Sequence, residues 1–213
     1  MFADQTWLAR IIWVLLALFA LDAVMQGNWP LAFVALATLG LSLVPLYAAR
    51  WADVVVPPSF IAAIVVFVGG TLFLGEVFDF YNRFWWWDMV MHAGSAIGFG
   101  LIGFVLVFMM FQGDRYAAPP LAVAFFAFCF ALAIGGLWEI FEFGMDQIFG
   151  LNMQKSGLMD TMADLIMDFI GALIGAGAGY AYLKGRAKGG LMGLIDDFVQ
   201  RNPRLFNRHR KRR

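Results

Sequence analysis

The sequence is poor in the residues that redox and thiolate chemistry require. Cysteine occurs once, at Cys129, which excludes an intramolecular disulfide and a thiolate metal site. Histidine occurs twice, and only His92 falls in an apolar stretch, so haem held by two intramembrane histidines is excluded. No lysine lies within a long apolar stretch, which argues against a retinal Schiff base. Phosphate-loop and Gly-x-Ser-x-Gly motifs are also missing.

Charge is scarce as well. Only 14% of the 213 residues are charged and 62% are hydrophobic, whereas a soluble domain is about a quarter charged. The mean hydropathy is +0.76, and several stretches reach the roughly 18–20 apolar residues that cross a bilayer. The composition therefore predicts an all-α, polytopic integral membrane protein.

Six transmembrane helices are expected to form one domain over 1–183, followed by a basic cytoplasmic tail over 184–213. Pro119 and Pro120 suit the start of the fifth helix, and Asp160 suits the N-cap of the sixth. The expected helices cover about 7–25, 30–49, 59–78, 88–111, 120–145 and 161–183.

The charges predict an orientation. Ten of the fifteen lysine and arginine residues lie in 184–213, and positive charge favours the cytoplasmic side. With six spans, both termini are then cytoplasmic, with Arg50 and Arg115 in cytoplasmic loops. The tryptophans at 85–87 are expected to anchor the chain at the opposite, outer interface.

The tail contains apolar residues at helical spacing: Leu191, Leu194, Ile195 and Phe198. They predict a short helix on the membrane surface, with the basic end near anionic lipid headgroups. A solvated tail that only fixes topology explains the pattern equally well. A nucleic-acid partner is not expected, whereas a homo-oligomer or a larger membrane complex is compatible with the composition.

Polar residues within the expected helices fall on shared faces. Asp88 and His92 lie within about 60° of each other on the fourth helix. Glu139, Glu142 and Asp146 share a face of the fifth helix. On the sixth, acidic residues and then glycines follow one stripe, where small residues let helices approach closely. That stripe consists of Asp160, Asp164, Asp168, Gly171, Gly175 and Gly179.

These faces predict one outward-facing polar pocket inside the bundle. Glu76 and Asp79 reach the same level from the end of the third helix, and Arg83 and Lys155 are the nearby bases. A charged carboxylate at mid-membrane costs on the order of 3 kcal/mol, so the cluster requires protonation, pairing or a bound cation.

A bound divalent metal ion best explains how several carboxylates can be clustered within the membrane. Carboxylates with one imidazole suit Mg²⁺, Mn²⁺, Ca²⁺, Fe²⁺ or Zn²⁺, and an aspartate four residues from a histidine can share an ion or orient the ring. The expected metal ligands are Asp88, His92, Glu139, Glu142, Asp164 and Asp168. The expected rim or outer residues are Glu76, Asp79, Arg83, Asp146, Lys155 and Asp160.

Three stretches carry a family resemblance: "YNRFWWWDMVMH", "LWEIFEF" and "DTMADLIMDFIGALIGA". Through them the chain resembles the YjdF-like family of small bacterial inner-membrane proteins and, more distantly, VanZ-like proteins named for teicoplanin resistance. The resemblance covers about 76–180. Asp168 departs from the VanZ-like pattern, which has an amide or small polar residue there. The resemblance implies family polar and close-packing positions at Asp88, His92, Glu139, Glu142, Asp160, Asp164 and Gly171.

Three functions remain open from the sequence. The first is an envelope enzyme acting on a lipid or lipid-linked headgroup, with a metal polarising the substrate and His92 or Glu142 as the general acid or base. The second is cation or proton transport, which clustered carboxylates in a membrane commonly mark. The third is a non-catalytic subunit whose polar cluster only stabilises the bundle.

Overall fold

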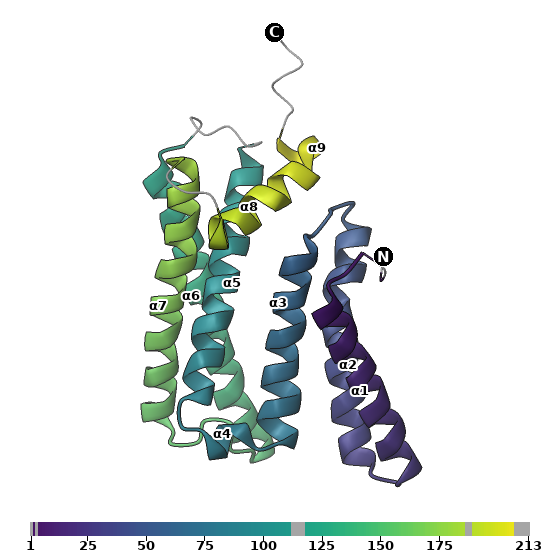
Figure 1. The fold of residues 1–213 in the computed structure, drawn as a ribbon. Helices are drawn as coiled ribbons and strands as arrows, with labels where there is room; N and C mark the ends of the chain where they lie inside the picture. Colours follow the sequence, from purple (N-terminus) through teal and green to yellow (C-terminus); the bar gives the residue numbers. More distant parts are fainter. Residues whose placement is uncertain (1, 3, 112–117, 186–188, 207–213) are drawn as a thin grey trace. The chain divides into compact units, whose positions relative to one another are not determined.

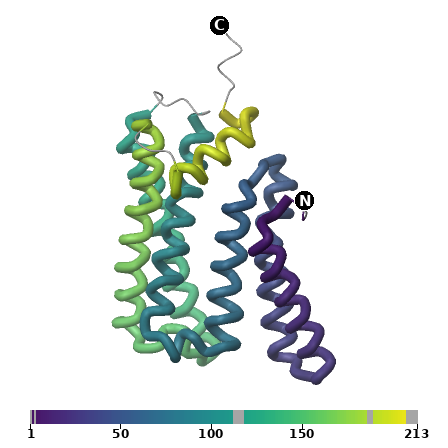
Figure 2. The backbone as a smooth tube through the Cα atoms, in the orientation of Figure 1, coloured from purple at the N-terminus to yellow at the C-terminus, as the bar shows by residue number. Residues whose placement is uncertain are grey.

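A computed structural model describes residues 2, 4–111, 118–185 and 189–206 of the chain. The described residues are helical where they are regular, and six helices are long and apolar enough to cross a membrane (Figures 1 and 2). The predicted all-α membrane fold is thus confirmed. The chain forms two compact units, Met1–Trp87 and Asp88–Arg213.

The first unit consists of three spans and a short helix. Its centre is apolar, with Ile61 and Val65 fully buried. Within this centre, Trp13 Nε1 donates a hydrogen bond of 3.0 Å to Ser42 Oγ. The elements are α1 (Trp7–Met25), α2 (Trp29–Trp51), α3 (Pro58–Val68), η1 (Gly69–Val77) and α4 (Phe80–Arg83).

The third span changes its winding halfway along. The sequence predicts one helix over 59–78, and a span is present at Pro58–Val77, but its second half, η1, is a π-helix. Such widened turns are rare, and glycine makes the local backbone adaptable here. At Gly75, an added Cβ would lie 2.9 Å from Tyr81 Cδ2. The backbone of η1 and the Tyr81 ring of α4 therefore approach closely.

The tryptophan run lies at the end of the first unit. Trp85 is 80% exposed and Trp86 is 40% exposed, whereas Trp87 packs edge-on against Phe80 with ring centroids 4.9 Å apart. The exposed rings suit the predicted interface anchor. That role stays a prediction, as does the orientation of the termini.

The second unit consists of three long helices and two short ones. In Figure 1, α5, α6 and α7 run side by side, and α8 lies across the end of α5 opposite to its start. The elements are α5 (Trp87–Met110), α6 (Pro120–Phe149), α7 (Leu158–Leu183), α8 (Gly190–Arg201) and α9 (Pro203–Phe206).

Glycines on α7 let it pack directly on the backbone of α5. A Cβ added at Gly175 would lie 2.5 Å from the Ile97 carbonyl oxygen and 3.0 Å from Gly100 Cα. Gly171 and Gly179 make equally close approaches, to the α5 residues Ala93, Ala96 and Phe104. Two helices in backbone contact hold the side chains near their ends in fixed relative positions.

Two predicted helix boundaries are wrong. The fifth span continues past 145 to Phe149, where Gly150 adopts φ 67° and ends it; a left-handed residue, usually glycine, commonly terminates a helix. The sixth begins at Leu158, so its N-cap is Gly157 rather than Asp160. Asp160 instead lies in the first helical turn, where the exposed N–H groups favour negative charge.

The predicted short helix of the tail is present as α8. Ile195 on α8 is 2% exposed, and Phe206 of α9 stacks on Phe108 of α5 with ring centroids 5.5 Å apart. Part of the apolar surface of this segment is therefore buried within its own unit, and contact with lipid headgroups stays a prediction. Arg115, Arg186, Lys188 and the basic residues 207–213 lie outside the described residues.

Candidate functional site

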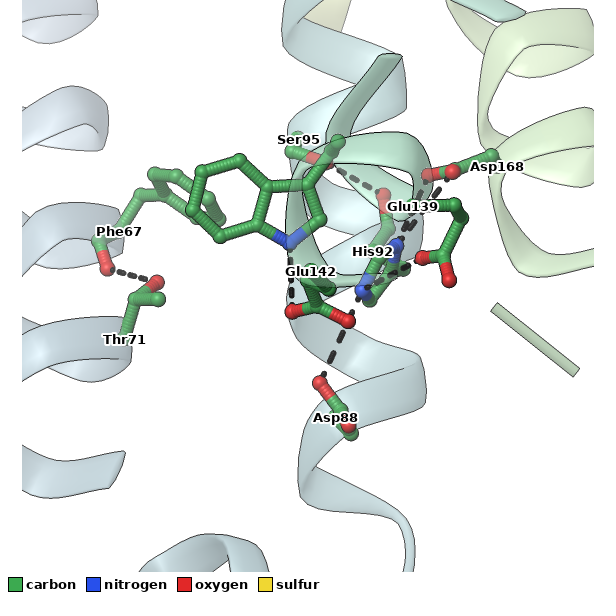
Figure 3. Close-up of polar contacts among 9 residues, drawn as sticks. Phe67, Thr71, Asp88, His92, Ser95, Glu139, Glu142 and Asp168 are labelled. Atoms are coloured by element: carbon green, nitrogen blue, oxygen red, sulfur yellow. Dashed lines mark hydrogen bonds and ion pairs between the residues drawn. The ribbon is translucent and has the colours of Figure 1, made fainter. Parts of the chain in front are cut away.

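His92 lies at the centre of the polar cluster, between carboxylates on three helices (Figure 3). It is 7% exposed and lies one turn after Asp88 on α5. Its Nε2 atom is 3.8 Å from Asp88 Oδ1 and 3.8 Å from Glu139 Oε1. Its Nδ1 atom faces Asp168, with both carboxylate oxygens 3.4 Å away. Each ring nitrogen thus has its own acidic neighbours.

The α7 stripe supplies two buried carboxylates to this cluster. Asp164 is 2% exposed and Asp168 is 1% exposed. One potential ligand atom from each of Asp88, His92 and Asp164 can be chosen so that all three lie within 4.8 Å of one another. The i, i+4 spacing places the polar groups of α5 on one face and those of α7 on one face, and the close packing of the two helices brings these faces together.

Glu139 on α6 is the least satisfied member of the cluster. Its side chain is buried, and neither carboxylate oxygen meets the distance and angle of a hydrogen bond, although the Thr161 side chain lies close enough to approach it as a donor. Asp168 Oδ1 also lacks a hydrogen-bond partner. A buried carboxylate without partners is unusual, because leaving such a group unsatisfied costs about 1–3 kcal/mol, and more when it is charged. The described residues form no Lys or Arg salt bridge to Glu139, Asp164 or Asp168.

Glu142 lies at the edge of the cluster. Its Oε1 atom accepts a hydrogen bond of 2.8 Å from Trp138 Nε1, and its side chain is partly exposed. Trp138 is not among the residues predicted from the sequence, although its i, i+4 spacing from Glu142 is a usable signal. The bond fixes one oxygen of Glu142 and leaves the other available.

Asp146 has a local structural role. Its two oxygens accept backbone hydrogen bonds from Met153 and Gln154, at 2.7 and 2.9 Å. The carboxylate thereby shapes the connection between α6 and α7, which also contains Lys155. Asp160, at the start of α7, is partly exposed.

Replacing Asp146 by alanine is expected to loosen this connection. Two charge-assisted backbone bonds would be lost, each worth about 1.5–3 kcal/mol. We expect faster proteolytic cleavage within 150–157 in detergent, and unchanged affinity for any ion at the cluster. Gln147→Ala, at an exposed neighbouring position, is the matched control. Equal cleavage of both variants would contradict this role.

The remaining predicted rim residues belong to the first unit. Glu76, Asp79 and Arg83 are exposed. Asp79 adopts φ 58°, and its Oδ1 accepts a hydrogen bond of 2.6 Å from Asn82 Nδ2. The side chain of Asp79 is thus engaged in organising the chain between η1 and α4.

The fold and the cluster define a polytopic membrane protein with buried carboxylates around one histidine. The chain belongs to the family described as Predicted membrane protein (DUF2238), which it matches over residues 5–185.

The chain is also similar to an "Uncharacterized protein" of Thermotoga maritima, with 30% identity over 117 residues. The match covers 53% of this chain and 57% of that protein. No solved structure matches the chain. The family match thus identifies a family of predicted membrane proteins. The VanZ-like resemblance stays an expectation.

Proposed function

We propose that this protein binds a divalent metal ion between α5, α6 and α7. The observation that carries the proposal is Glu139. Its buried carboxylate makes no well-formed hydrogen bond, with only the Thr161 side chain approaching as a donor, and it faces the histidine that Asp88 and Asp164 also approach. A divalent cation would neutralise this concentration of acidic groups and would accept the oxygens that the protein leaves unsatisfied.

The spacing of the ligand atoms suits such an ion. Metal bonds to nitrogen and oxygen of about 2.0–2.6 Å place two ligands of one ion about 3–5 Å apart. The 3.8 Å distances from His92 Nε2 to Asp88 and Glu139 lie in this range. The proposed ligands are therefore His92 Nε2 and carboxylate oxygens of Asp88, Glu139 and Asp164. One imidazole among carboxylates suits Zn²⁺, Fe²⁺ or Mn²⁺ better than Mg²⁺ or Ca²⁺.

The depth of the cluster supports chemistry on a lipid or lipid-linked headgroup. Asp88 and Asp160 lie in the first turns of α5 and α7, and His92 lies roughly 6 Å beyond Asp88 along α5 at 1.5 Å per residue. A metal at that depth can polarise a phosphoryl or acyl oxygen near the membrane surface. With His92 as a ligand, Glu142 is the better candidate for moving a proton, because it has a free oxygen at the edge of the cluster.

Packing beyond the cluster disfavours the transport alternative. Past Asp168, the described α5–α7 interface is formed by glycine, alanine and apolar side chains as far as Tyr182, with Gly171 and Gly175 against the α5 backbone. An ion or proton pathway needs polar groups or water along its length, and between Asp168 and Tyr182 the two helix backbones approach too closely to leave room for them.

The test is metal binding by the full-length protein in detergent. We expect purified protein, stripped and then dialysed against Mn²⁺ or Zn²⁺, to retain one ion per chain. Glu139→Gln and Asp164→Asn should each weaken binding by more than about 100-fold, the upper range for loss of an outer-shell partner. Asp22→Asn, an exposed acid of α1, should bind normally. Failure to retain any of the five candidate ions would overturn the proposal.

A further inference from the structure

We propose that Asp168 is a positioning residue that fixes the orientation and tautomer of His92, so that Nε2 is presented to the metal. The inference rests on the proposed metal site. It also assigns Asp168 a role different from the direct ligation that the sequence suggests.

The geometry separates the two nitrogens of the ring. Both oxygens of Asp168 lie 3.4 Å from Nδ1, whereas the carboxylates of Asp88 and Glu139 face Nε2 (Figure 3). Neither Asp168 nor Glu139 belongs to the group of Asp88, His92 and Asp164 whose ligand atoms lie within 4.8 Å of one another, but the two differ in the ring nitrogen that they face. A carboxylate that accepts a hydrogen bond from Nδ1–H leaves the Nε2 lone pair free for a metal, the usual arrangement at histidine-ligated sites.

Asp168 is held in place by a glycine on α6. A Cβ added at Gly135 would lie 2.6 Å from Asp168 Cγ and still closer to Oδ2. The carboxylate is thus lodged against the α6 backbone at a point where only glycine leaves room for it. Asp168 is 1% exposed, so protein atoms also surround its side chain on the other sides.

The contact with Gly135 allows the Asp168 carboxylate to be displaced by a substitution that changes no polar group. Gly135→Ala would push the Asp168 carboxylate away from its position, whereas Gly136→Ala is a matched control because nothing lies within 4 Å of its added Cβ. Asp168→Asn is the chemical counterpart. Its amide can turn its NH₂ group toward the ring and favour a proton on Nε2, which removes the lone pair from the metal side.

The first readout is the ring itself, observed without metal. Because the chain has only two histidines, a full-length His209→Ala background leaves His92 as the single ¹⁵N-histidine signal. At a pH high enough to keep the ring neutral, we expect a proton on Nδ1 and none on Nε2. Asp168→Asn and Gly135→Ala should shift population toward the Nε2–H tautomer, and Gly136→Ala should not.

The second readout is affinity for Mn²⁺ or Zn²⁺. Loss of an outer-shell partner typically weakens metal binding about 10–100-fold, and we expect that loss in Asp168→Asn and Gly135→Ala but not in Gly136→Ala. Unchanged tautomer and unchanged affinity in both variants would overturn the positioning role, as would a proton on Nε2 in the parent protein. If the parent protein binds no metal but shows the expected tautomer shifts, the proposed metal site fails and the positioning contact stands.

Discussion

Replacing His92 by alanine is expected to abolish divalent-metal binding and to lower the free energy of unfolding by about 3–5 kcal/mol, the cost of removing one partner from a buried ionic pair. The loss of stability arises because Asp168 loses the side chain that both of its oxygens approach, while its buried environment remains. The measurements are elemental analysis and denaturant unfolding of the metal-free protein in detergent, followed by tryptophan fluorescence.

A double variant distinguishes the two effects of His92→Ala on stability, which are the loss of a partner for Asp168 and the loss of the imidazole volume. In His92→Ala/Asp168→Asn the buried group is a neutral amide, which costs less to keep without a partner than a carboxylate does. The double variant should therefore unfold at a higher denaturant concentration than His92→Ala alone, although neither binds metal. Ser95→Ala, which removes only a bond to the His92 carbonyl, is the control and should be close to neutral. Wild-type stability in His92→Ala would contradict the stabilising role of His92 in the cluster, and wild-type metal affinity would contradict its proposed role as a ligand.

Replacing Gly175 by alanine is expected to separate α5 from α7. Its new methyl group would meet the Ile97 carbonyl and the Gly100 backbone, and backbone atoms cannot move aside as a side chain would. Overpacking of this kind typically costs about 1–3 kcal/mol. Because α5 carries His92 and α7 carries Asp164, the displacement should also weaken metal binding, even though Gly175 lies about three turns from Asp164 along α7.

The same helix offers a matched control. A Cβ at Gly177 meets nothing within 4 Å, so Gly177→Ala should be neutral or slightly stabilising, since alanine favours a helix over glycine by about 0.5–1 kcal/mol. The two variants add the same methyl group two residues apart and gain the same helix propensity, so their unfolding free energies should differ by the overpacking cost of about 1–3 kcal/mol. Equal stabilities would mean that the close α5–α7 approach does not contribute to the fold.

These variants also distinguish an ion-dependent function from a purely structural cluster. If the polar groups only stabilise the bundle, the stability of each variant should not depend on added metal. If the cluster binds an ion, wild-type stability should rise with metal concentration by mass action, by about 2.7 kcal/mol at one hundred times the dissociation constant. That increment should vanish in His92→Ala.

Much of the architecture follows from the sequence alone. Length and apolar content determine which segments can cross a membrane, because about 20 residues of helix are needed to span the hydrocarbon core. The 3.6-residue period likewise determines that Asp88 and His92 share a face, as do Asp164 and Asp168. Boundaries were less predictable, as at Gly157 and Phe149, because capping depends on backbone conformations that composition does not specify.

The tertiary structure decided what each acidic residue can do. Asp146 and Asp168 both follow the predicted stripes, yet one binds backbone N–H groups of a loop and the other faces a histidine 76 residues away. Helical periodicity assigns a residue to a face but says nothing about which atoms of another helix lie opposite. Only the packed glycines, at Gly135 and along α7, set those distances, because they decide how closely the helix backbones approach.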